Sequence, residues 1–154
     1  MEMPKPGEAH QKLARLAGRW LGEETMFPSP WDPEGGTAQA TTEARVALGG
    51  FGVVSDYEQR RGGQVTYSGH GVWMIDTQES GCLLHWFDSL GMGLEVFRGD
   101  WDGDVLKVQS RNPMGHARLT YDLSEADALK VSMETSEDGE TWRPMFRGAY
   151  TRQS

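Results

Sequence analysis

The sequence predicts an all-β protein: an up-and-down antiparallel β-barrel of about ten strands, with a short N-terminal helix plugging one end. Three observations predict this fold. The 154 residues include 20 glycines and 6 tryptophans, a composition that suits bent strands around an aromatic-lined interior. Asp-Gly and Gly-Gly pairs separate runs of alternating polarity, which is typical of β-hairpins. Because nearly all connections are short, successive strands should pair antiparallel.

The helix is predicted at residues 8–17, EAHQKLARLA. Leu13, Leu16 and Ala17 recur at the i, i+3, i+4 spacing of a helix, and Gly18 follows where a C-terminal cap belongs. A single helix of this length is not stable alone, so it should pack on the rest of the molecule. The end of the barrel is the surface we expect it to cover.

Ten strands are predicted to follow the helix. They lie at about 19–27, 38–48, 51–60, 64–76, 82–90, 93–101, 104–111, 115–123, 128–136 and 141–152. An open sheet of ten strands would curl, and closure removes both exposed edges. Residues 19–152 are therefore expected to form a closed barrel, and residues 1–154 a single domain. The space inside should be wider than in an eight-stranded barrel, where one small ligand already fits.

Closure predicts one specific contact, between the first strand and the last. Antiparallel pairing brings Trp20 and Arg152 to the same rim, with three further pairs beyond them: Gly22 with Tyr150, Glu24 with Gly148, and Met26 with Phe146. An arginine laid across a tryptophan face gains about 0.5–2 kcal/mol, and it can also bond the carbonyls at the end of the helix. We assign Trp20 and Arg152 a structural role.

Residues 83–90, LLHWFDSL, place His85, Asp88 and Ser89 within five positions of one another. Side chains alternate between the two faces of a strand, so Asp88 points away from the other two, which lie about 13 Å apart. The members of a catalytic triad must be within hydrogen-bond reach, and the chain has no Gly-x-Ser-x-Gly elbow. The motif therefore argues against a hydrolase, and we assign no catalytic residue.

The hairpin of residues 64–90 allows two registers. One places His70 opposite Asp88 and Val72 opposite Trp86, while the other places His70 opposite Ser89. A His–Asp pair can anchor a ligand or relay a proton, or it can simply satisfy two polar groups. The other face of the hairpin carries Trp73, Ile75, Leu83 and Phe87. Since monomers rarely expose large apolar patches, we expect that face to form a homodimer interface.

Alternation along the first strand makes Glu24 point inward whenever Trp20 does, and a carboxylate inside the barrel needs a partner. The predicted ligand-binding residues are Glu24, His70, Trp86, Asp88, Phe146 and Tyr150. An apolar interior with a few converging polar groups favours binding of a small hydrophobic or amphipathic ligand. The alternatives are an enzyme that uses a His/carboxylate pair inside the barrel, with His70 or Glu24 acting alongside Asp88, or a haem-binding protein.

Composition excludes several partners. The formal charge of −8 would repel polyanions, so neither nucleic acid nor an anionic membrane is expected as a partner. The start of the chain lacks a secretory signal, and no apolar run reaches the ~20 residues of a spanning helix. Cys82 is the only cysteine, which fits a reducing cytoplasm. His70, His85 and His116 lack close ligand spacing, so neither a metal site nor a cofactor is expected.

Five segments carry a family resemblance: PGEAHQKLARLAGRWLGEE at 6–24, LGG at 48–50, GHGVWMID at 69–76, HWFDSLG at 85–91 and YTR at 150–152. In order and over nearly the full length, they resemble the pattern of the bacterial domain-of-unknown-function family 1579. The resemblance implies a calycin-like barrel with an N-terminal helical plug, and it implies no established activity.

The Gly-x-Trp-x-Gly start at Gly18 also resembles, more distantly, the opening of nitrobindin, a ten-stranded haem barrel. That resemblance implies an axial histidine close to the C-terminus. This chain has no histidine after His116, so haem would need His70, His85 or His116 as a substitute ligand.

Overall fold

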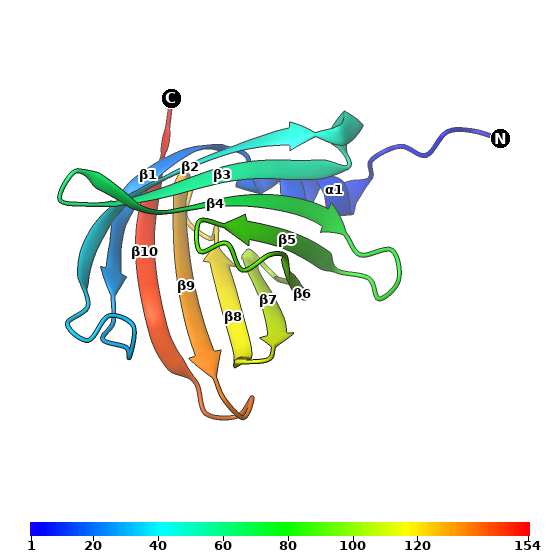
Figure 1. Cartoon of the computed structure of the whole chain (residues 1–154). Coiled ribbons are helices and arrows are strands. Elements are labelled where there is room, and N and C mark those ends of the chain that lie inside the picture. Colours follow the sequence, from blue (N-terminus) through cyan, green and yellow to red (C-terminus); the bar gives the residue numbers. More distant parts are fainter.

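Ten strands, joined in chain order by short connections, close into one antiparallel barrel in the computed structural model, which describes residues 1–154 (Figure 1). Each strand neighbours the next in sequence, and the last pairs with the first, so the predicted fold is confirmed. The strands are β1 (Gly18–Met26), β2 (Gly36–Ala47), β3 (Gly52–Arg61), β4 (Gln64–Ile75), β5 (Cys82–Asp88), β6 (Glu95–Asp102), β7 (Val105–Asn112), β8 (Gly115–Asp122), β9 (Ala128–Ser136) and β10 (Arg143–Gln153).

One end of the barrel is closed by the N-terminal helix. Helix α1 (Glu8–Leu13) is shorter than predicted because Ala14–Leu16 form the tighter 3-10 turn η1, as often happens at the end of an α-helix. A second 3-10 turn, η2 (Leu48–Gly50), joins β2 to β3. Helix α1 contacts β3 and β4, and Pro6 lies against Gly50, whereas the residues before Pro6 extend away from the barrel (Figure 1). None of the helices has the length and hydrophobicity that crossing a membrane would take.

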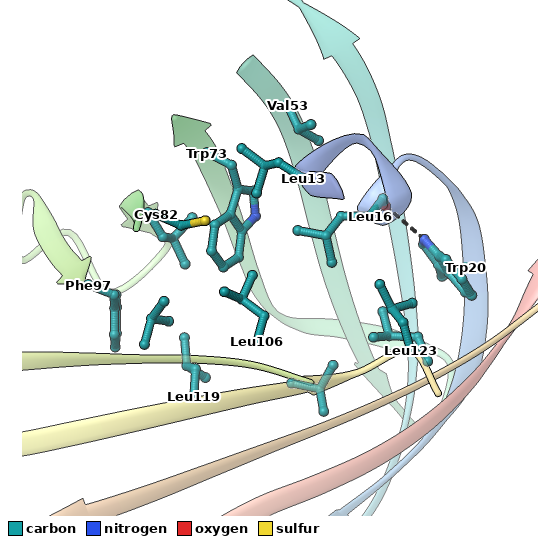
Figure 2. Close-up of a cluster of buried hydrophobic side chains, with 14 of the residues drawn as sticks. Leu13, Leu16, Trp20, Val53, Trp73, Cys82, Phe97, Leu106, Leu119 and Leu123 are labelled. Carbon is teal, nitrogen blue, oxygen red and sulfur yellow. Dashed lines mark hydrogen bonds between the residues drawn. The ribbon is translucent and has the colours of Figure 1, made fainter. Parts of the chain in front are cut away.

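Leu13 and Leu16 of this plug are buried against the main hydrophobic core, which occupies the same end of the barrel (Figure 2). Trp20 is fully buried there, and its indole Nε1 donates to the carbonyl of Leu16 at 3.0 Å. Both polar ends of that contact are satisfied, so the plug is tied to β1 without leaving a buried donor unpaired. The other core residues include Val53, Trp73, Cys82, Leu84, Phe97, Leu106, Leu119 and Leu123.

The seam between β1 and β10 has the predicted register. Trp20 pairs with Arg152, Gly22 with Tyr150, Glu24 with Gly148, and Met26 with Phe146. The guanidinium of Arg152 lies 4.2 Å from the Trp20 ring centroid and donates to the carbonyls of Ala17 and Arg15. The arginine therefore links the last strand to the end of the helical plug, as predicted.

The register of the β4–β5 hairpin differs from both predicted registers. Ile75 pairs with Cys82, and His70 pairs with Phe87 rather than with Asp88 or Ser89. The physical reason lies in the connection. The backbone N–H of Asp76 donates to the Gly81 carbonyl at 2.8 Å, and the Asp76 carboxylate accepts the backbone N–H groups of residues 78 and 79 at 2.9 and 3.1 Å. An Asp side chain that caps the loop in this way fixes its length, and with it the register.

A shift of one residue moves side chains to the other face of the sheet. Trp86 and Asp88 point into the barrel, as predicted, but they face Gly71 and Gly69 instead of Val72 and His70. The side chain of His70 is exposed on the outer face, where its Nδ1 lies 2.8 Å from an Asp56 carboxylate oxygen. The placement of His70 inside the barrel is therefore wrong.

Candidate ligand-binding site

The candidate site is the half of the bore that α1 does not fill; here the bore means the space that the ten strands enclose. Strand alternation points one residue in two toward it. We call this half the open half. Its inward-pointing residues include Glu24, Met26, Tyr57, Gln59, Tyr67, Trp86, Asp88, Glu95, Tyr121, Met133, Phe146 and Tyr150.

Glu24 is completely buried and accepts hydrogen bonds from three neutral donors. The Tyr57 hydroxyl donates to its Oε1 at 2.6 Å, Gln59 Nε2 donates to the same oxygen at 2.9 Å, and the Tyr150 hydroxyl donates to Oε2. Burial, and then the nearby charge of Glu24, raises the pKa of Tyr57 and of Tyr150 well above the usual range. Both phenols therefore keep their protons and act as donors to the carboxylate.

Asp88 forms a second polar group nearer the mouth. The Tyr67 hydroxyl donates to its Oδ2 at 2.7 Å, and Trp86 Nε1 donates to the same oxygen at 3.2 Å. Burial, followed by the hydrogen bond to Asp88, raises the pKa of Tyr67 above its usual range. Like Glu24, this carboxylate is satisfied by neutral donors alone.

Glu95, at the start of β6, is a third inward carboxylate. Its Oε2 accepts a hydrogen bond from Ser110 Oγ at 3.0 Å and one from Asn112 Nδ2 at 2.8 Å. Both donors lie on the neighbouring strand β7, so the contact is a cross-strand one on the inner face of the barrel.

Glycines allow the aromatic rings of the open half to lie against the barrel wall. A Cβ at Gly69 would meet the Trp86 ring at 2.0 Å, and a Cβ at Gly148 would meet the Tyr150 hydroxyl at 2.2 Å. The ring of Tyr57 lies 6.1 Å from that of Trp86, in a tilted arrangement. Because the rings rest on bare backbone, they line the bore rather than fill it.

Solvent reaches side chains deep inside the open half. Tyr57, Tyr121 and Met133 all point inward, yet each is partly exposed. Tyr121 lies deep in the barrel, where its ring meets Trp73 of the plugged core at 5.1 Å and burial raises its pKa. Partly exposed inward-pointing residues such as Tyr57 and Met133 indicate that the protein's own atoms leave part of the open half unfilled.

A groove of about 240 Å³ lies at the mouth, where β10 bulges between Pro144 and Phe146. Its lining includes Phe27, Met133, Phe146 and Arg147. Met133 and Phe146 point into the bore, whereas Ser132, Glu134 and Arg147 of the same lining face outward, so the groove lies mainly on the outer side of the wall.

None of the four histidines points into the bore. His10 accepts a hydrogen bond from the backbone N–H of Gly7, His70 and His85 lie on the outer face, and His116 lies beside Trp142. The residues of the bore therefore fit neither a His/carboxylate catalyst nor a haem held by an axial histidine. No three His, Cys, Asp or Glu side chains come together in a group that could hold a metal ion.

Of the six residues predicted for the site, all except His70 point into the open half: Glu24, Trp86, Asp88, Phe146 and Tyr150. Sequence reasoning missed Tyr57, Gln59, Tyr67 and Glu95. A signal for the first two exists in residues 53–60, where Val, Ser, Tyr and Gln alternate with Val, Asp, Glu and Arg. The charged set marks the outer face and thereby assigns Tyr57 and Gln59 to the inner one.

This combination of a sealed wall, a helical plug and an open aromatic half defines a calycin-like β-barrel. The chain belongs to the family described as "Protein of unknown function (DUF1579)", whose model matches residues 5–152.

Two solved structures have a similar fold. The crystal structure of Rv2717c from M. tuberculosis is 18% identical, with a TM-score of 0.73 and coverage of 96% of this chain and 99% of that one. The S-type phycobiliprotein lyase CPES from Guillardia theta is 9% identical, with a TM-score of 0.61 and coverage of 97% and 99%. At such identities the likeness shows the barrel fold alone. The comparison with curated proteins found no match.

Proposed function

We propose that this protein binds a small hydrophobic or amphipathic molecule in the open half of its barrel. The observation that carries the proposal is the partial exposure of inward-pointing residues such as Tyr57, Trp86 and Met133, inside a wall with no free strand edge. A packed barrel would bury these side chains, as the plugged half buries Leu106 and Val108.

The chemistry of the lining supports the same proposal. Ligand sites combine large apolar or aromatic surfaces with a few convergent polar groups that orient the ligand. The open half offers the rings of Tyr57, Trp86 and Phe146 together with the carboxylates of Glu24 and Asp88. The likeness to a protein named a phycobiliprotein lyase adds support at the level of fold.

A variant that fills the bore tests the proposal. Thr135 points inward near the mouth and is partly exposed, whereas Thr25 lies on the outer face of β1. Thr135→Trp should abolish the fluorescence gain of the neutral probe N-phenyl-1-naphthylamine, and Thr25→Trp should leave it unchanged. Equal titration curves for the two variants would place the probe outside the barrel. Native mass spectrometry of protein isolated from its host then identifies the molecule it carries.

We also propose that the outer face of β3–β6 forms a homodimer interface. Val54, Val72 and Val96 lie in one row across that face, beside the 45% exposed Phe87. Trp73 and Ile75 do not belong to this surface, because the observed register points both into the barrel. Sedimentation equilibrium at micromolar concentration should give a dimer mass that Phe87→Glu reduces to a monomer. A monomer mass for the unmodified chain would count against the interface.

The proposed location is the cytoplasm. The one cysteine, Cys82, is buried, and burial raises the pKa of its thiol to about 11. A protonated, buried thiol has no disulfide partner and little reactivity, which fits a reducing compartment. Cell fractionation of the native host is the direct measurement.

A further inference from the structure

We propose that the ligand of the open half is an organic cation, such as an ammonium or quaternary ammonium group that carries an apolar chain. This inference rests on the proposed function, because it specifies which chemical class the bore accepts. Two independent features of the lining carry it: the sign of its charges and the nature of its walls.

Below the rim of the open half, the formal charges that face the bore are negative. Glu24, Asp88 and Glu95 come from β1, β5 and β6, so they face the bore from different parts of the wall. Their hydrogen-bond donors are all neutral: phenols, amides, an indole, a hydroxyl and a backbone N–H. None of the ion pairs of the protein includes any of these three carboxylates.

Of the positive charges around the mouth, two are engaged elsewhere, and a third, Arg143, lies at the rim opposite Thr135. Arg61 is ion-paired with Asp32 of the β1–β2 loop at 2.7 Å, and Arg118 is paired with Glu134 on the outer face at 2.9 Å. The bore therefore has no arginine or lysine bonded to its carboxylates, and below the rim an anionic ligand would meet only like charge. This repulsion between like charges would exclude anionic ligands from the bore.

The walls between the carboxylates are aromatic faces. Tyr57 and Tyr67 lie 5.9 Å apart edge to face, and Trp86 lies beside both. A cation placed within about 6 Å of such a ring gains about 0.5–2 kcal/mol, with the larger values at desolvated sites. A purely apolar ligand would use these rings but would leave the carboxylates without any new partner, and a cation uses both.

A matched series of probes separates ligand charge from ligand shape. Octyltrimethylammonium, 1-octanol and octanoate share one alkyl chain and carry charges of +1, 0 and −1. We expect isothermal titration to give octyltrimethylammonium an affinity at least about tenfold above that of 1-octanol, which corresponds to about 1.4 kcal/mol. Octanoate should bind more weakly than 1-octanol.

Charge-neutral variants assign the preference to the bore. Glu24→Gln keeps the size of the side chain but removes its charge, and Asp88→Asn does the same nearer the mouth, where it tests the inference even if the first variant folds poorly. Both should reduce the ratio of the octyltrimethylammonium affinity to the 1-octanol affinity. Glu23→Gln is the matched control, because Glu23 is exposed on the outer face of the same strand, and its ratio should equal that of the unmodified protein.

The outcomes distinguish the inference from the function on which it rests. Equal affinities for the three probes, or a preference for octanoate, would overturn the cation inference and leave ligand binding in the bore intact. A cation preference that Glu23→Gln abolishes as strongly as Glu24→Gln would place the binding outside the barrel. Absence of binding by all three probes would contradict both proposals.

Discussion

Glu24 shows how a carboxylate is kept inside a barrel without a positive partner. Its oxygens accept from Tyr57, Gln59 and Tyr150, so the desolvation of the acid is offset by hydrogen bonds from groups that are themselves neutral. Removing one donor leaves the others in place, whereas removing the carboxylate leaves the phenols of Tyr57 and Tyr150 without their acceptor. The residue is thus a structural centre, and its charge lies behind the phenols of Tyr57 and Tyr150.

The raised pKa values of Tyr57 and Tyr150 predict a loss of stability at high pH. The folded barrel holds these protons more tightly than the unfolded chain does, so their contribution is complete below about pH 10 and is lost as the pH rises further. Above that pH, each tyrosine should lower the free energy of unfolding by up to about 1.4 kcal/mol per pH unit. Urea denaturation at a series of pH values measures this slope.

Tyr150→Phe should make the decline of stability above pH 10 shallower, because the variant has only one of the two phenols whose pKa is raised. At neutral pH the same variant should be about 1–3 kcal/mol less stable, since Glu24 loses a donor. A slope above pH 10 that is identical in the variant and the unmodified protein would contradict the assignment.

Two glycines on the inner face of β4 leave room for an aromatic ring on the neighbouring strand β5. Gly69 and Gly71 stand on its inner face opposite Asp88 and Trp86, and the indole lies across the bare backbone. Aromatic side chains that cover a glycine on the neighbouring strand are a known means of stabilising sheets. Here the arrangement also determines how much of the bore remains free.

Alanine at these two positions should have graded effects. A Cβ at Gly69 would come within 2.0 Å of the Trp86 ring, while one at Gly71 would meet its nearest side-chain atoms at 3.0 Å. Gly69→Ala should therefore displace Trp86 from Tyr67 and Asp88 and lower the free energy of unfolding by about 1–3 kcal/mol. Gly71→Ala, on the same strand and face, should cost less. Equal denaturation midpoints for the two variants would show that the ring does not rest where the structure places it.

The hairpin of β4 and β5 also shows where sequence reasoning stopped. Alternation correctly grouped Trp86 with Asp88, because those two residues are on one strand. It placed His70 on the wrong face because the partner strand depends on the loop that Asp76 caps, and the hydrogen bonds of that side chain are not visible in a polarity pattern. Tyr67 was missed for the same reason.

At the scale of the whole molecule, the fold depends on the seam between the first and last strands. The sequence was sufficient here, since a ten-stranded meander needs a partner for each edge, and Trp20 and Arg152 offer a distinctive contact at one rim. Glu24, Phe146 and Tyr150 were found because they follow from this one register. The sequence did not predict how much of the bore stays unfilled. That depends on how twelve or more inward-pointing side chains, from all parts of the wall, pack against one another.

Arg152 tests the seam. Its guanidinium rests on Trp20 and bonds the carbonyls at residues 15 and 17, so Arg152→Met should lower the free energy of unfolding by about 1–3 kcal/mol. Arg152→Lys should not restore it, since an ammonium group cannot stack and bond in the same planar manner. Arg19 is the control on the adjacent strand, where its exposed pair with Glu43 should make Arg19→Met nearly neutral, within about 0.5 kcal/mol. A similar loss of stability in Arg152→Met and Arg19→Met would contradict a special role of Arg152 in the seam.

The bond between Tyr150 and Glu24 joins residues that are 126 positions apart. Contacts between such distant positions form slowly, because a long loop of chain must first be brought together. A chain emerging from the ribosome would have nine strands before it had the tenth, and until then Glu24 would lack its third donor. If the proposed ligand binding requires the closed barrel, a probe bound in the bore would report, during refolding, the moment at which the first and last strands pair.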